Sequence, residues 1–109
     1  MFKATISGRL GSDPEMKYTP AGEPVTNIRI AHNFKKGDRV DVEWVKVACW
    51  GEELAEKANE LAKGELVQAV GDVTFSLWID ATGKERKSCE LRADAMGKVA
   101  IPSEAEGTP

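Results

Sequence analysis

Apolar and polar residues alternate along most of the chain, a pattern that predicts β-strands. The first alternating run covers residues 2–10, and residues 16–18 form a short extended piece between two clusters of glycine and proline. Alternation resumes over residues 25–32, where Thr26, Ile28 and Ile30 share one face and Arg29 lies on the other. Residues 35–38, Lys-Lys-Gly-Asp, predict a hairpin loop. The first third of the chain is therefore predicted to be short strands joined by tight turns.

The predicted strand over residues 40–50 has two faces of different kinds. One face is small and apolar, as a barrel interior requires, and consists of Val45, Val47 and Cys49. The opposite face carries two tryptophans and a lysine, namely Trp44, Trp50 and Lys46. Both faces cannot pack into the interior of one small barrel. Two explanations stay open at this point: the tryptophan face binds a ligand, or the helix or another subunit covers it.

The apolar period changes to 3.6 residues over residues 52–63, which predicts one amphipathic helix. Its expected apolar positions are Leu54, Ala58, Leu61 and Ala62. Glutamates fill the first turn, and Gly64 is expected to end the helix. We interpret the acidic residues of this helix as a solvated face.

Strands are predicted again after the helix. A strand over residues 66–72 is followed by a run with an apolar face that we expect to point to the core, made of Val73, Phe75, Leu77 and Ile79. Trp78 lies on the opposite face, so we expect it to point outward. Residues 80–84 close a hairpin, and residues 85–93 return with Cys89 and Leu91 on one face and Arg86 on the other.

The order of three strands, one helix and two further strands predicts an all-β fold. It fits the five-stranded OB-fold barrel with one α-helix between strands 3 and 4. The 109 residues have room for one ordinary domain, which we assign to residues 1–99. Residues 100–109 have no apolar period and are expected to form a disordered tail. The fold alone does not settle the ligand, because OB-folds bind both oligonucleotides and oligosaccharides.

The sequence lacks the motifs that mark common enzymes. Cys49 and Cys89 have no second metal ligand nearby, His32 lies beside no nucleophile motif, and no glycine-rich phosphate loop is present. We therefore expect no enzyme activity, no cofactor and no metal, and two reduced thiols. The chain has neither an apolar run of about 18 residues nor a secretory signal, so we expect a cytoplasmic protein.

The net charge of −3, from 15 basic and 18 acidic residues, argues at first against a nucleic-acid partner. The charges are, however, unevenly distributed. Residues 52–65 hold five acidic and two basic side chains, and residues 100–109 hold two further acidic ones. The rest of the chain keeps 13 basic against 11 acidic residues, which permits a basic groove without demonstrating one.

Aromatic rings and cations share the predicted outward positions. Proteins that bind single strands without sequence preference need flat rings on which bases stack and cations that follow the phosphates. The candidate stacking residues are Phe34, Trp44, Trp50 and Trp78. The candidate phosphate contacts are Lys3, Arg29, Lys35, Lys36, Lys46, Lys84 and Arg86. Stacking contributes about 1–3 kcal/mol per base. We therefore expect stacking to supply more of the binding free energy than the phosphate contacts do.

Several segments, in order along the chain, resemble the bacterial single-stranded DNA-binding protein family. GRLGSDPEMKYTPAG, residues 8–22, is similar to the family's N-terminal signature, and WVKVACWGEELA, residues 44–55, to its passage from the third strand into the helix. LAKGELV, residues 61–67, and GDV, residues 71–73, resemble the next strand, and WIDATGK, residues 78–84, resembles the last hairpin. The resemblance covers residues 2–99 and is interrupted only in loops.

This resemblance implies non-catalytic binding and protection of single-stranded DNA during replication, recombination and repair. It places the family's stacking aromatics on Phe34, Trp44, Trp50 and Trp78. It also implies a homotetramer in which first strands, residues 1–7 here, pair across a dimer. The family often has an uncharged polar residue at the position of Arg9, so a phosphate contact and a purely surface role both stay open there.

Three departures from the family pattern change the expected binding. Ser76 and Leu77 stand where the family often has basic residues, and Glu52 is acidic, so we expect a lower affinity or a different DNA path. The loop over residues 34–44 is short and offers less surface for wrapping. The family's acidic tip, which recruits replication and repair proteins, is absent from this chain. Either the sequence is part of a longer chain, or this member, viral or specialised, does not recruit partners in that way.

Other classes of function stay open on the sequence alone. An RNA-binding or primosome-type OB-fold protein would be separated from a DNA-binding one by competition between matched oligomers. A protein-interaction module would use the outward tryptophans as a subunit interface, so its emission would respond to protein concentration and not to oligo-dT. An enzyme would show turnover that depends on His32.

Overall fold

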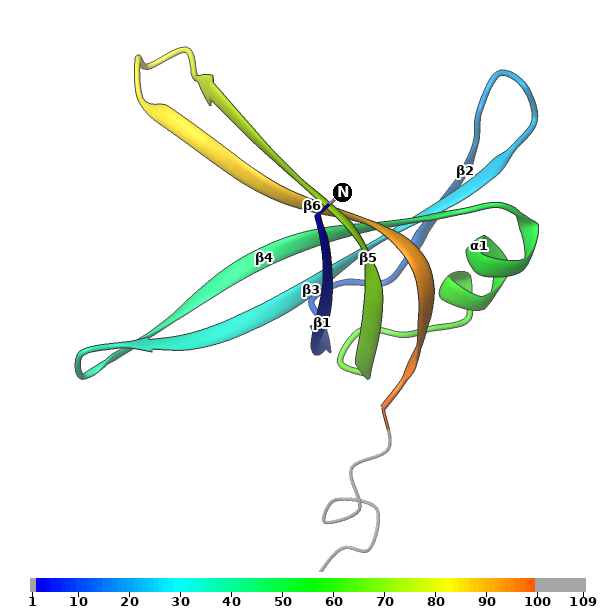
Figure 1. Ribbon diagram of the computed structural model, residues 1–109, viewed down its shortest axis with the longest axis horizontal. Coiled ribbons are helices and arrows are strands. Elements are labelled where there is room, and N and C mark those ends of the chain that lie inside the picture. The colour runs from blue at the N-terminus through cyan, green and yellow to red at the C-terminus, as the bar shows by residue number, and fades with distance from the viewer. Residues whose placement is uncertain (1, 100–109) are drawn as a thin grey trace, which may run out of the picture.

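The computed structural model describes residues 2–99, which form strands and a single helix in a fixed order (Figure 1). The elements are β1 (Lys3–Leu10), β2 (Glu15–Tyr18), β3 (Pro24–Lys36), β4 (Arg39–Trp50), α1 (Glu52–Asn59), β5 (Leu66–Ile79) and β6 (Glu85–Lys98). The expected tail, residues 100–109, lies outside the described residues. Within residues 2–99 no helix is long and apolar enough to cross a membrane.

Strand pairing closes five of the strands into a ring. The sheet order is β1-β5-β6-β4-β3-β2, and β1 also pairs with β3 at Arg9 and Leu10, which joins the two ends. Short β2 pairs with β3 outside this ring. The β4–β6 pairing is parallel, and the others are antiparallel. The predicted five-stranded OB-fold is confirmed, with α1 between the third and fourth strands of the ring in chain order.

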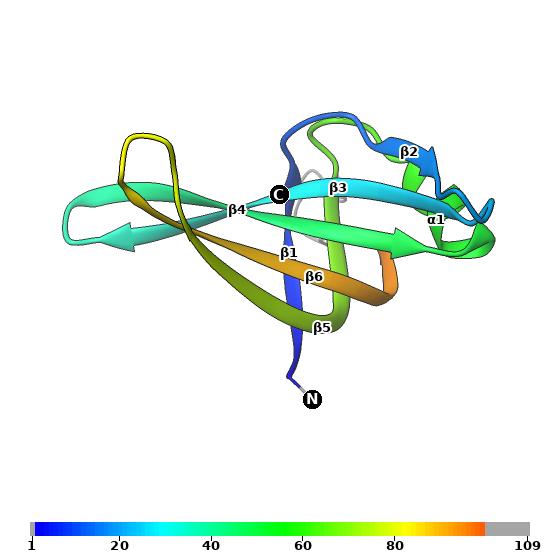
Figure 2. The ribbon, with the colours of Figure 1, turned by 90° about the horizontal axis from the view of Figure 1, so that it is seen from above.

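The core lies inside the ring and continues under the helix. The predicted inward faces of β3 and β4 are confirmed, because Ile28, Ile30 and Val47 are fully buried. Ala55 and Ala58 of α1 are also fully buried, and the buried Thr26 hydroxyl donates a hydrogen bond to the Ala55 carbonyl oxygen at 2.7 Å. The helix therefore closes one end of the barrel, away from the long hairpins (Figure 2).

Two hairpins project from the other end of the barrel as arms. The parallel pairing of β4 with β6 begins at Val45 and Cys89, so the hairpins separate beyond that pair. We call residues 31–44 the β3–β4 arm and residues 76–88 the β5–β6 arm. The two arms diverge from the barrel and leave a fork between them (Figure 1).

The expected core face of β5 is wrong beyond Val73. Phe75, Leu77 and Ile79 are 59%, 69% and 71% exposed, and only Val73 of this run packs against the core. The alternation was correct in grouping these side chains on one face. The face lies outside the barrel, however, because β5 is one continuous strand of 14 residues that follows β6 into the arm.

The helix ends earlier than predicted. It stops at Asn59, one turn before Lys63, and Ala62 is exposed. Leu61 reaches the core through a turn, in which its amide donates to the Ala58 carbonyl oxygen, and the chain then reverses toward β1. Gly64 serves this reversal and not the helix end: its φ is +92° and its amide donates to the Leu10 carbonyl oxygen at 2.9 Å.

Candidate nucleic-acid interface

Trp44 is held on the outer surface of the barrel by two neighbouring elements. Its side chain is 45% exposed, as the alternation of β4 predicted. The guanidinium carbon of Arg29 lies 5.3 Å from the centroid of the indole, a cation–π arrangement. The ring also lies against Gly11, where an added Cβ would be 2.0 Å from the indole Cζ3. The indole thus keeps a defined position while half of its surface stays open to a ligand.

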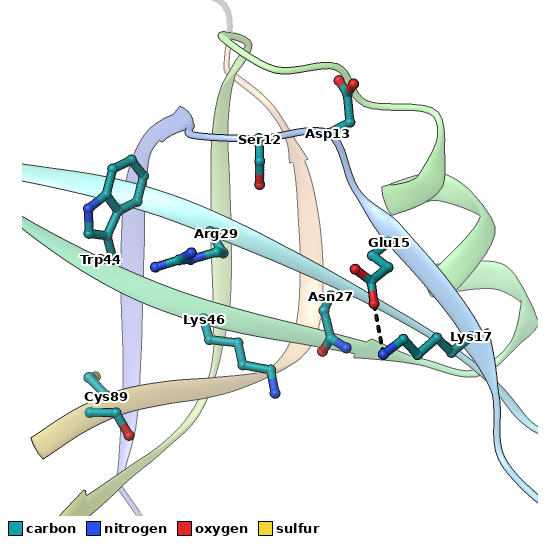
Figure 3. A pocket seen from close by; sticks show the side chains of 10 residues that line it. Ser12, Asp13, Glu15, Lys17, Asn27, Arg29, Trp44, Lys46 and Cys89 are labelled. Atoms are coloured by element: carbon teal, nitrogen blue, oxygen red, sulfur yellow. Dashed lines mark ion pairs between the residues drawn. The ribbon is translucent and has the colours of Figure 1, made fainter. Parts of the chain in front are cut away.

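Arg29, Lys46 and Lys17 form a basic strip next to Trp44. Arg29 and Lys46 are opposite each other in the β3–β4 register. They line a pocket of about 430 Å³ with Trp44, Asn27 and Lys17 (Figure 3).

Two carboxylates, Asp13 and Glu15, line the same pocket and reduce its positive charge. Lys17 Nζ lies 2.8 Å from Glu15 Oε1, and this hydrogen bond lowers the pKa of Glu15 and raises the pKa of Lys17. Three cations still stand against two carboxylates. The sequence reasoning missed Lys17, although its place in the short strand β2 beside β3 was a usable signal.

Trp50 lies at the end of β4, next to the helix, and an arginine side chain lies over its ring. The side chain is half-buried, and the guanidinium carbon of Arg92 lies 5.0 Å from the ring centroid. Arg92 comes from β6 and was not among the candidate contacts. Its outward position followed from the alternation of β6, but its pairing with Trp50 depends on the parallel β4–β6 register.

Trp78 lies on the β5–β6 arm, 47% exposed and opposite Arg86 in the register. Arg86 Nε donates a hydrogen bond to Asp80 Oδ2 at 2.8 Å. The Asp80 carboxylate also accepts hydrogen bonds from the Thr82 hydroxyl and amide and from the Lys84 amide. These bonds, the one from the Thr82 hydroxyl first, lower the pKa of Asp80 to about 2. The turn is therefore a fixed support for Trp78 and Arg86.

One cleft of about 1180 Å³ lies between β1, which lines it from Ala4 to Ser7, and the bases of the two arms, and two of the tryptophans line it. Trp44 and Trp78 both line it, together with Arg29 and Arg86. Trp44 and Arg29 also line the smaller pocket, so the two hollows are neighbours on the outer surface. Trp50 lines neither of them.

The remaining sequence candidates lie elsewhere. Lys3 lines neither hollow: its ammonium is paired with Asp94 and lies 3.6 Å from Asp72 Oδ2, and the hydrogen bond to Asp94 raises its pKa. Lys35 and Lys36 are exposed at the tip of the β3–β4 arm. Phe34 belongs to β3 opposite Asp41, and its side chain lies outside the described part of the structure.

No cluster suited to a metal ion is formed by the His, Cys, Asp and Glu side chains of residues 2–99. Burial raises the pKa of the Cys49 thiol to about 11, and both cysteines are free. The described chemistry of the outer surface is thus that of rings and cations.

Comparison with known proteins identifies the family. The sequence matches the model of the single-strand binding protein family over residues 1–99. The chain belongs to this family. It is 32% identical over 105 residues to the single-stranded DNA-binding protein of Deinococcus radiodurans, an alignment that covers 92% of this chain. The chain spans only 35% of the length of that relative. The family indicated by the sequence motifs is confirmed.

Proposed function

We propose that this single-strand binding family member holds single-stranded DNA on its outer surface by base stacking, supported by phosphate contacts, and catalyses no reaction. The observation that carries the mechanism is that Trp44 and Trp78, from different hairpins, line one cleft and are both about half exposed. Exposed indoles are unfavourable in water unless a partner covers them, and every base offers a flat face to do so. Trp50 and Phe34 complete the proposed stacking set.

The proposed phosphate contacts differ in how much of their charge is available. Arg29 and Lys46 lie beside Trp44, so they have the largest expected share. Arg86 lies opposite Trp78 but is paired with Asp80, so its expected share is smaller. Lys35, Lys36 and Lys84 are exposed in the hairpin tips and would meet a strand that extends beyond the barrel. Lys3 has the smallest expected share, because two carboxylates already compensate its charge.

We further propose a homotetramer built from dimers in which β1 pairs with its counterpart. The family is one that oligomerises, and the described edge of β1 fits that assembly. One side of β1 pairs with β5 from Lys3 to Arg9, but the other side meets β3 only at Arg9 and Leu10. Within residues 2–99 no strand pairs with the second edge of residues 3–8, and such an edge is a template for another strand.

The cellular role we propose is protection of exposed single strands during replication, recombination and repair, in the cytoplasm at the nucleoid. Replication and repair proteins are the expected partners of such complexes. Because the chain spans a third of its relative, these whole-protein roles rest on the family and not on these residues alone.

Titration with oligo-dT tests the proposed function. Bases that stack on Trp44, Trp50 and Trp78 are expected to quench tryptophan emission, and single Ala variants at these positions are expected to weaken binding. A matched oligo-rU titration measures the DNA preference. Emission that ignores oligo-dT but changes with protein concentration would assign the tryptophans to a subunit interface instead.

A further inference from the structure

The cleft in the fork contains two aromatic rings that the stacking mechanism above does not use. Phe2 and Phe75 both line it, and their ring centroids lie 6.0 Å apart with an interplanar angle of 45°. Phe2 is 58% exposed and Phe75 is 59% exposed. Two large apolar rings therefore contact each other and still present more than half of their surface inside the cleft.

The position of the cleft explains how these rings relate to the tryptophans. Phe75 and Trp78 lie on opposite faces of their hairpin, and Phe75 shares its face with Val73, which packs against the core, so we call that face the inner one. The cleft lies where the two arms diverge, so residues from both faces reach it. A DNA strand that passes through the fork would run from Trp44 and Trp78, on the outer surface, to Phe75, on the inner face.

The charge of the cleft favours a polyanion. Its charged lining consists of the cations Arg29, Arg86 and Lys87 and one carboxylate, that of Glu43. Arg86 is paired with Asp80, so Arg29 and Lys87 supply the excess of positive charge. Lys87 is exposed and lies opposite Leu77 in the register, one pair further along the inner face than Phe75. A cation next to an exposed ring is the pair of groups that sequence-tolerant binding of a single strand requires.

The size of the cleft also favours a polymer over a small ligand. Its volume of about 1180 Å³ exceeds the range of about 300–1,000 Å³ that is typical of small-molecule sites. Because Trp44 lines both the cleft and the pocket beside Lys46, a strand bound on Trp44 would lie at the edge of the cleft.

We propose that single-stranded DNA held on Trp44 and Trp78 passes through this fork, where Phe75 is a further stacking surface and Lys87 contacts a phosphate. This inference rests on the proposed function and adds an inner-face segment to the DNA path. Longer strands gain from it, because a short oligonucleotide is already accommodated on the outer surface.

Phe75→Leu tests the stacking, because it keeps an apolar side chain of moderate size and removes the flat ring. For oligo-dT of about 16 nucleotides, the upper end of the range that one OB-fold covers, we expect affinity to fall about 5- to 150-fold. For oligo-dT of about 4 nucleotides we expect a much smaller change. Phe75→Tyr keeps a ring and is expected to retain binding. Leu77→Ala is the matched control: it lies on the same strand and face, and it does not line the cleft.

Lys87→Gln tests the phosphate contact. We expect the slope of log K against log salt to become shallower by about 0.7, the value for one phosphate of a single strand. Lys57→Gln, in α1 at the other end of the barrel, is the control and is expected to leave the slope unchanged.

Three results would overturn the inference, and they separate it from the proposed function. If wild-type protein binds oligo-dT and Phe75→Leu binds every length equally well, the path avoids the fork while the proposed function stands. If Phe75→Leu and Leu77→Ala both lower the mass of the oligomer in light scattering, a second copy covers this face. If wild-type protein does not bind oligo-dT at all, the proposed function fails first. Urea unfolding of Phe75→Leu and Phe75→Tyr checks that both variants fold.

Discussion

Gly11 is expected to control DNA binding without touching DNA, through the position of the Trp44 indole. A Cβ added at Gly11 would lie 2.0 Å from Cζ3 and 2.3 Å from Cη2 of that ring. Since carbon atoms in contact prefer about 3.5–4.0 Å, Gly11→Ala must displace the indole by about 1.5 Å or more. Gly11 is not among the glycines with positive φ, so alanine adds no backbone strain.

The substitution should separate binding from stability. The indole is 45% exposed and can rotate into solvent without leaving a cavity in the core. The free energy of unfolding should therefore change little. Replacement of glycine by alanine at a compatible position stabilises by about 0.4–1 kcal/mol through the unfolded chain. We therefore expect an unchanged or slightly higher free energy of unfolding. Binding is expected to weaken by up to the contribution of one stacked base, about 1–3 kcal/mol, or about 5- to 150-fold.

Fluorescence anisotropy of labelled oligo-dT, with urea unfolding in parallel, measures both quantities. Gly97→Ala is the matched control, because a Cβ there meets only Lys57 Nζ, at 3.7 Å. It should leave binding unchanged and give the same small change in the free energy of unfolding as Gly11→Ala. In the double variant Gly11→Ala/Trp44→Ala the loss should equal that of Trp44→Ala alone. Additive losses, or a Gly11→Ala variant that binds like wild type while Trp44→Ala does not, would refute the reasoning.

The other predictions concern folding and ionisation. Trp78→Ala should barely change the free energy of unfolding in urea, whereas Leu91→Ala, at a fully buried site, should cost about 2–5 kcal/mol; equal losses would place Trp78 in the core. Asp80 has a pKa of about 2, caused first by the Thr82 hydroxyl, so its stabilisation of the turn should persist above pH 3.8 and disappear as pH falls through about 2. A carboxyl ¹³C shift titration with a midpoint near 4 would contradict this. Cys49, with a pKa of about 11, should react with iodoacetamide at neutral pH only after denaturation; alkylation of the native protein would show that it opens.

Within the ring, the alternation of apolar and polar residues correctly predicted which side chains of a strand are exposed. On β4 the apolar side chains Val45 and Val47 are buried, and Trp44 and Lys46 are exposed, as their spacing indicated. This worked because the barrel interior accepts only one face of each strand. The residue types on the opposite face then predict what kind of ligand that face would contact.

The same alternation was misleading in the second half of β5, from Phe75 onward. It grouped Phe75 with Leu77 correctly, but periodicity does not tell whether the shared face lies over a core or beyond it. The length of the arm is set by pairing between β5 and β6, and the place where it leaves the barrel is set by the β4–β6 contact. A buried Phe75 would make Phe75→Ala cost about 3–5 kcal/mol of folding free energy, but at 59% exposed the substitution should cost much less.

Contacts between distant segments were also beyond the sequence. The neutralisation of Lys3 by Asp94 joins residues 91 positions apart, and the position of Arg92 over Trp50 needs the parallel register. Both are tertiary effects that local pattern does not encode. Net charge was equally uninformative, because the local balance of cations and carboxylates beside Trp44 is what a phosphate meets.

The closed ring also has a consequence for how the chain is made. Of the strands within residues 2–99, β6 is the last to be synthesised, yet it bridges β4 and β5, so the barrel cannot close until Lys98 has left the ribosome. Pairing β1 with β5 further requires closure of a loop that contains most of the chain. Such non-local pairing places folding in the millisecond-to-second range. A chain cut before β6 would not be a smaller barrel: it would be an open sheet with unpaired edges, the form most prone to aggregate.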